Sequence, residues 1–72
     1  MDVKQLKYFI EVTKSGSFTR AANQLYITQP AISRIIKSLE DELGVPLFVR
    51  SRKHLSLTEA GKVFYNHAQQ ME

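Results

Sequence analysis

The sequence contains no cysteine, and no stretch of it is apolar for long. Without cysteine the chain has neither disulfides nor thiolate chemistry, and its two histidines, His54 and His67, have no nearby pair of ligands at the spacing of a metal site. Crossing a bilayer takes about 20 consecutive apolar residues, and the first residues lack the apolar segment of a secretory signal. These absences argue against metal and redox roles, predict no cofactor, and favour a cytoplasmic protein.

Acidic residues are missing from two long windows. The chain has ten Lys and Arg against seven Asp and Glu, a net charge of +3, but no acid lies in residues 12–39 or 43–58. Glu40, Asp41 and Glu42 separate the two windows. A basic stretch is often only a solvated face, which is our interpretation of Lys4, Lys7 and Lys62. The two windows are harder to explain in that way.

The length of 72 residues and an apolar content of 43% are typical of one small domain with one core. Apolar periodicity and capping residues predict helices at about residues 2–14, 17–25 and 29–43, with Tyr26 and Ile27 in a turn. Thr28 or Gln29 caps the third helix. The expected core positions are Leu6, Phe9, Ile10 and Thr13 in the first helix and Ile32, Ile35, Ile36, Leu39 and Leu43 in the third.

After Gly44 and Pro46, which end the third helix, the runs at 47–50 and 55–57 have strand character. They predict a two-stranded hairpin, or wing, with a loop of about four residues. Thr58 then caps a fourth helix with an apolar stripe that reaches the end of the sequence: Ala60, Val63, Phe64, Ala68 and Met71. The expected fold is mainly α, a winged helix-turn-helix followed by a further helix, and the unstopped helix suggests a piece of a longer protein.

The exposed side of the third helix has the chemistry of a DNA-reading surface. With about 100° between successive residues, the side roughly opposite the core carries Gln29, Ser33, Arg34 and Lys37. Arg and Lys donate to guanine, Gln pairs with adenine, Ser serves base edges or phosphate, and Pro30 can meet a thymine methyl. A solvated face would usually carry i,i+4 pairs of Glu and Lys, whereas this one has no acid before Glu40. We therefore predict contact with DNA.

The wing offers a second basic surface. Arg50, Arg52 and Lys53 surround its tip and could reach a minor groove, where narrow A·T tracts attract arginine. The alternative for the tip is a solvated loop. Arg50 has a second alternative, because it could pair with Glu40 or Glu42 and lock the wing against the third helix.

The segment SFTRAANQLYITQPAISRIIKSLEDELGVPLFVR, followed by LSLTEAG, resembles the amino-terminal winged helix-turn-helix domain of the LysR-type transcriptional regulators. The match covers nearly the whole chain, although the wing sequence SRKH lacks a glycine that family members often carry there. The resemblance implies that residues 18–37 are the DNA-binding motif. It places Thr28, Gln29, Pro30, Ser33 and Arg34 at groove-facing positions, and Arg52 and Lys53 at backbone or minor-groove positions.

The resemblance also implies a division of the chain, into a DNA-binding domain at residues 1–58 and the start of a linker helix at 59–72. That helix would pair two subunits and lead to an effector-binding domain absent from this chain, through which any small-molecule effector would act. The resulting hypothesis is a homodimer on an interrupted inverted repeat in double-stranded DNA. Arg20, Lys37 and the wing would contact phosphates, and Gln29, Pro30, Ser33 and Arg34 would discriminate bases.

Two other classes of function compete with DNA binding. A winged helix can serve as a protein-interaction or dimerisation module whose basic face is incidental. Catalysis is the weakest alternative, because Asp2, Asp41, His54 and His67 fall on different predicted elements and so short a chain leaves little room for a pocket. The sequence therefore predicts a DNA-binding transcriptional regulator and not an enzyme.

Overall fold

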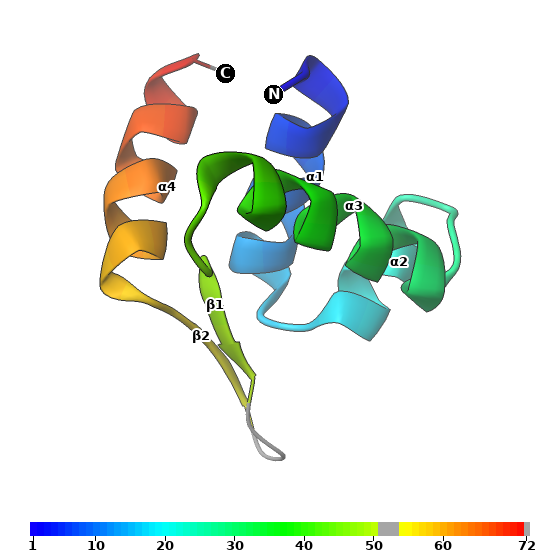
Figure 1. Cartoon of the computed structure of the whole chain (residues 1–72). Coiled ribbons are helices and arrows are strands. Elements are labelled where there is room, and N and C mark those ends of the chain that lie inside the picture. The colour runs from blue at the N-terminus through cyan, green and yellow to red at the C-terminus, as the bar shows by residue number, and fades with distance from the viewer. Residues whose placement is uncertain (51–53, 72) are drawn as a thin grey trace.

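The computed structural model describes residues 1–50 and 54–71 (Figure 1). The elements along the chain are α1 (Val3–Ser15), α2 (Phe18–Gln24), α3 (Gln29–Leu43), β1 (Phe48–Arg50), β2 (Leu55–Leu57) and α4 (Glu59–Met71). α1 packs against α2, α3 and α4, and the two strands project away from these helices as a hairpin (Figure 1). The predicted winged helix-turn-helix followed by a further helix is confirmed.

Every helix starts at a capping side chain, which explains why its beginning could be predicted. Asp2 accepts from the backbone N–H of Gln5 (2.7 Å), and the Gln5 side chain accepts in return from the N–H of Asp2 (3.0 Å). Thr28 Oγ1 caps α3 by accepting from the N–H of Ala31 (3.2 Å), so the alternative cap, Gln29, is instead the first helical residue. Ser17 and Thr58 cap α2 and α4 in the same way.

The core is centred on Phe9 of α1, which is completely buried. Its ring lies 5.3 Å from that of Phe48 and 5.1 Å from that of Phe64, between ring centroids, so that α1, the wing and α4 meet at one point. The buried contributions of the helix-turn-helix are Ala21, Ala22, Ile32, Ile36 and Leu39. Two predicted core positions of α3 are less buried than expected, since Ile35 is half-buried and Leu43 is exposed.

The predicted apolar faces of α1 and α4 need correction. In α1, Gln5 and Val12 are buried, whereas Thr13 is only half-buried. α4 turns Gly61, Phe64, Tyr65 and Ala68 toward the core, a spacing of three and four residues. Two members of the predicted stripe, Val63 and Met71, are instead 58% and 55% exposed. The stripe combined residues from two adjacent faces of the helix, and only one of them packs inward.

The wing is antiparallel, with Phe48 opposite Leu57 and Arg50 opposite Leu55. The predicted strands at 47–50 and 55–57 agree with this pairing to within one residue, while most of the predicted loop, residues 51–53, lies outside the described residues. Gly61 lets α4 pass close to the wing, because a Cβ there would stand 2.1 Å from the carbonyl oxygen of Leu47. Any other residue at position 61 would force the helix and the wing apart.

Candidate nucleic-acid interface

The first three turns of α3 carry the side chains of this helix that are predicted to contact DNA. Gln29, Pro30, Arg34 and Lys37 are exposed and Ser33 is half-buried. The side-chain amide of Gln29 donates to Ser33 Oγ one turn along, at 2.8 Å. This bond uses one of the two amide N–H donors and leaves the other donor and the carbonyl oxygen for a base edge. The structure thus brings two of the predicted residues together as one pre-arranged polar unit.

Arg34 is the cation on this face that has no acidic partner within residues 1–50 and 54–71. It borders a shallow hollow between α3 and the start of α1, which is lined by Asp2, Lys4, Gln5, Arg34, Ile35 and Ser38. Lys4 is exposed, as expected for a solvated face, and it also borders the same hollow as Arg34. Only the packing of α1 across α3 reveals this neighbour.

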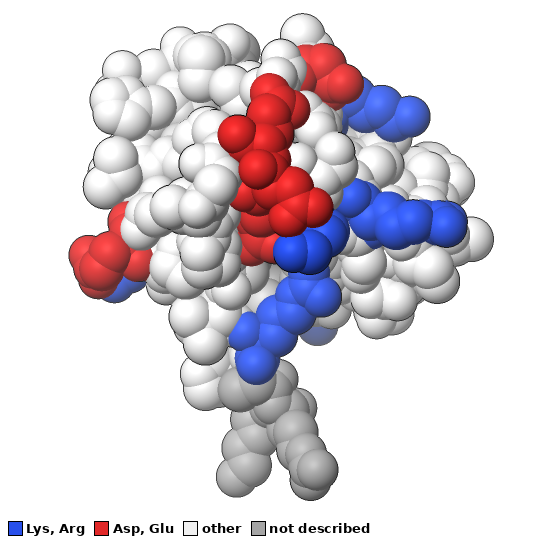
Figure 2. All heavy atoms as spheres, viewed as in Figure 1, with Lys and Arg blue, Asp and Glu red and all other residues white. Residues whose placement is uncertain are grey.

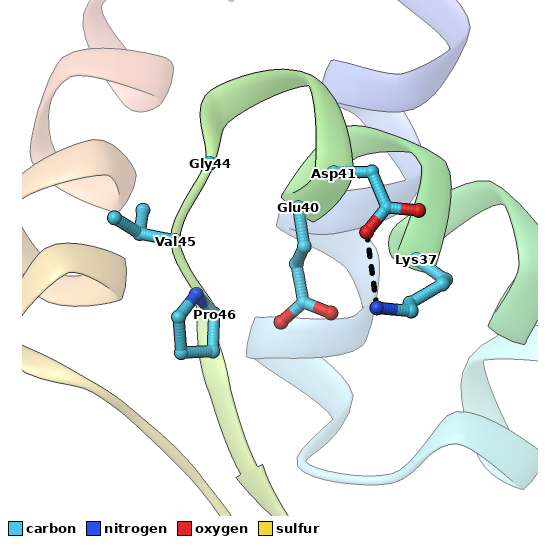
Figure 3. Close-up of a pocket in the computed structure, with 6 residues that line it drawn as sticks. All are labelled: Lys37, Glu40, Asp41, Gly44, Val45 and Pro46. Atoms are coloured by element: carbon cyan, nitrogen blue, oxygen red, sulfur yellow. Dashed lines mark hydrogen bonds and ion pairs between the residues drawn. The ribbon is translucent and has the colours of Figure 1, made fainter.

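Lys37 is engaged by an acid of its own helix. Its Nζ lies 3.0 Å from Asp41 Oδ1 (Figure 3). Both side chains are about two-thirds exposed. They border an open hollow of about 320 Å³ with Glu40, Gly44, Val45 and Pro46. The expectation that this face is free of acid pairs therefore holds for Gln29, Ser33 and Arg34 but not for Lys37. The i,i+4 spacing of Lys37 and Asp41 could have predicted the pair.

Arg50 takes neither of the ionic partners considered for it. Glu40 Oε2 accepts from the backbone N–H groups of Leu47 (2.6 Å) and Phe48 (3.3 Å), and Glu42 pairs with the N-terminal ammonium group. The guanidinium carbon of Arg50 instead lies 4.3 Å from the centroid of the Phe18 ring. The predicted lock between wing and α3 does exist, but Glu40 makes it through backbone N–H groups, and Arg50 attaches the wing to α2 by a cation–π contact.

The remaining residues predicted to contact DNA are Arg20, Thr28, Arg52 and Lys53. Arg20 is exposed in the first turns of α2, and its Nη1 donates to the carbonyl oxygen of Ser15 (3.4 Å). The hydroxyl of Thr28 is used as the cap of α3. Arg52 and Lys53 lie outside the described residues.

Charge is divided sharply across this side of the molecule. Figure 2 shows acidic side chains gathered in a ridge over the C-terminal part of α3, with basic side chains directly beside it and toward the wing. The acids of that part of the helix are Glu40, Asp41 and Glu42. A negatively charged polymer that binds at the first turns of α3 would contact the basic side chains and avoid repulsion from the acidic ridge.

Comparison with known proteins connects this arrangement to a family. Residues 3–62 match the family model described as "Bacterial regulatory helix-turn-helix protein, lysR family". The chain belongs to the LysR family. It is 48% identical over 71 residues to the "Probable cat1 operon transcriptional activator" of Acinetobacter lwoffii, covering 99% of this chain and 23% of that protein. It is 46% identical over 72 residues to the "HTH-type transcriptional regulator BsdA" of Bacillus subtilis, covering 99% and 25%.

This LysR-family chain thus spans about a quarter of the length of these two relatives. Solved structures resemble it closely. "BenM_DBD/catB site 1 DNA Complex" has a TM-score of 0.95 at 41% identity, covering 99% of this chain and 80% of that one. "CbnR_DBD-DNA complex" has a TM-score of 0.93 at 42% identity, covering 99% and 82%.

The described part of this LysR-family chain holds no group of three His, Asp or Glu side chains able to bind a metal. Within the same residues, none of the helices has the length and hydropathy that a membrane span requires.

Proposed function

We propose that this chain binds double-stranded DNA sequence-specifically as the DNA-binding part of a LysR-type transcriptional regulator. α3 lies in the major groove, where the face formed by Gln29, Pro30, Ser33 and Arg34 reads base edges. Arg20, Lys37 and the basic residues of the wing, Arg50, Arg52 and Lys53, contact the phosphate backbone or the adjacent minor groove, and Thr28 holds the start of α3 at the groove.

The observation that carries this proposal is the state of the α3 face. Gln29, Ser33 and Arg34 are within reach of solvent, no acid pairs with them among the described residues, and two of them are already bonded to each other. A face that merely kept a helix soluble would gain from opposite charges one turn apart. A face that must lie against DNA loses binding free energy for every carboxylate it carries, because that carboxylate repels the phosphates.

The chain would act as a homodimer on an interrupted inverted repeat, with residues 1–58 binding DNA and residues 59–72 beginning the linker helix. Support for pairing through α4 comes from an apolar groove lined by Leu43, Val45, Leu47, Ala60, Val63, Phe64 and His67. Two-fold symmetry would place the half-sites about 10 bp apart, or a multiple of that spacing. In the longer protein a separate domain would bind the small-molecule effector, and the protein would work in the cytoplasm as a non-enzymatic regulator.

Selection of bound duplexes from a random pool, followed by titration at two salt concentrations, tests this function. We expect an enriched half-site repeated with two-fold symmetry, and an affinity at least about 10³-fold above that for scrambled duplex. If the chain enriches no sequence and binds all duplexes equally weakly, it is not a specific DNA reader. Assembly through the apolar groove alone would then favour the protein-interaction module.

A further inference from the structure

Tyr26, in the turn between α2 and α3, is the most exposed of the large apolar side chains in residues 1–50 and 54–71, at 95% of its full accessibility. It also has the only positive φ, 59°, of any described residue other than glycine. A bulky side chain pays a steric penalty in this left-handed conformation, because its Cβ approaches the backbone. Because the ring is exposed and the backbone is strained, packing of the Tyr26 side chain does not explain why a tyrosine stands here.

The turn is a Schellman motif, and Tyr26 occupies the position that normally favours glycine. The N–H of Ile27 donates to the carbonyl oxygen of Ala22 (3.0 Å), and the N–H of Tyr26 donates to that of Asn23 (3.3 Å). The ends of two other helices in this chain can be compared with this turn. α1 and α3 also end in left-handed residues, and there they use Gly16 (φ 69°) and Gly44 (φ 76°).

The place of Tyr26 in the motif suggests what the ring meets. Three peptide units separate Tyr26 from Gln29, so their Cα atoms are at most about 11 Å apart. The major groove is about 12 Å wide, and α3 enters it by its first turns. A segment that leads into those turns must pass one wall of the groove, and that wall is the sugar-phosphate backbone.

Building on the proposed function, we propose that Tyr26 contacts this backbone. Its hydroxyl donates a hydrogen bond to a phosphate oxygen, and its ring packs against the neighbouring deoxyribose. Tyrosine suits this position because it offers an apolar ring and a neutral donor together, and tyrosine hydroxyls are among the side-chain groups that bind phosphate. The strain at Tyr26 is then offset by binding to DNA. A glycine at this position would relieve the strain but could not contact the DNA backbone.

The test compares Tyr26→Phe, which removes only the hydroxyl, with Tyr26→Asn, which removes the ring and tolerates the left-handed conformation. Both are measured in the full 72-residue chain, for melting temperature and for affinity to the selected duplex and to a scrambled one. Tyr26→Phe should weaken binding to each duplex about tenfold, the size of one hydrogen bond to a charged group. Tyr26→Asn should weaken binding further, while its melting temperature equals or exceeds that of the natural chain.

The salt dependence of DNA affinity distinguishes a phosphate contact made by Tyr26 from one made by lysine or arginine. Because tyrosine is neutral and displaces no counterion, neither variant should change the slope of log affinity against log salt concentration. Unchanged affinity in both variants, with the natural chain still selecting its site, would overturn the role of Tyr26 and leave the proposed function intact. A loss confined to the selected duplex, or a melting temperature that falls together with the affinity, would also overturn it. If the natural chain binds no DNA, both proposals fail.

Discussion

The two ends of α3 treat charge in opposite ways. The first three turns carry Gln29, Ser33 and Arg34, for which the described residues provide no acidic partner. The last turns carry Glu40, Asp41 and Glu42, each of which has a partner within the protein: two backbone N–H groups of the wing, Lys37 and the N-terminal ammonium group. Carboxylates at a helix C-terminus are disfavoured by the helix dipole. These partners offset that penalty. Those of Glu40 and Glu42 lie outside the surface assigned to DNA, whereas Asp41 pairs with Lys37 at its border.

The largest effect should come from the acid that supports the wing. Glu40→Ala leaves the N–H groups of Leu47 and Phe48 without their acceptor, at two residues that are themselves buried. We expect the free energy of unfolding to fall by about 3 kcal/mol in urea denaturation. Glu42→Ala is the matched control and should cost under about 1 kcal/mol, because its ion pair is exposed. Equal losses of unfolding free energy in the two variants would mean that the hydrogen bonds of Glu40 to the wing stabilise the fold no more than the ion pair of Glu42 does.

The next effect belongs to the opposite end of the helix. Arg34→Ala should reduce discrimination at one base pair by about 1–3 kcal/mol in titrations against a panel of single-substituted duplexes. Stability should hardly change, because the side chain is exposed and has no ion pair among the described residues. An unchanged ranking of the duplexes would remove Arg34 from the base-reading set.

Substitution of Arg50 tests whether a basic residue near the proposed DNA interface also stabilises the fold. Arg50→Ala should lower the free energy of unfolding by about 0.5–1 kcal/mol, since it loses the cation–π contact with Phe18. Repeating the substitution in a Phe18→Leu background should abolish most of that loss. The same loss in both backgrounds would show that the contact contributes nothing.

The smallest effect should come from the ion pair between Lys37 and Asp41, which joins the two ends. Asp41→Asn frees Lys37 and removes a negative charge beside the DNA surface. Binding to selected and scrambled duplexes should tighten about twofold, the equivalent of about 0.4 kcal/mol. Glu59→Gln, which frees Lys62 on α4 in the same manner, is the control and should leave DNA affinity unchanged. Weaker binding by the Asp41 variant would contradict this division of charge.

Features that depend on neighbours in the sequence could be predicted. The caps at Ser17, Thr28 and Thr58, and the end of α3 at Gly44, follow from local hydrogen bonds and backbone sterics, so the elements were placed to within one residue or so. The fold class followed from the order of these elements. The left-handed conformation of Tyr26 could not be predicted from the sequence, because the left-handed residue at a helix end is usually glycine or asparagine.

Features that depend on the path of the chain in space could not be predicted. The hydrogen bonds from Leu47 and Phe48 to Glu40, and the position of Arg50 over Phe18, form only once the first strand of the wing packs beside α3 and α2. The inward face of α4 was ambiguous for a related reason. Two adjacent sides of that helix carry apolar residues, and the close approach at Gly61 decides which of them packs against the core.

The most direct test is a map of backbone and side-chain NMR shifts during titration of the labelled chain with its selected duplex. We expect the largest shifts at Gln29, Ser33 and Arg34, on the α3 face where no acid pairs with them among the described residues. Undisturbed signals from those three residues, with shifts concentrated instead at the groove formed by Leu43, Val45 and Val63, would contradict it.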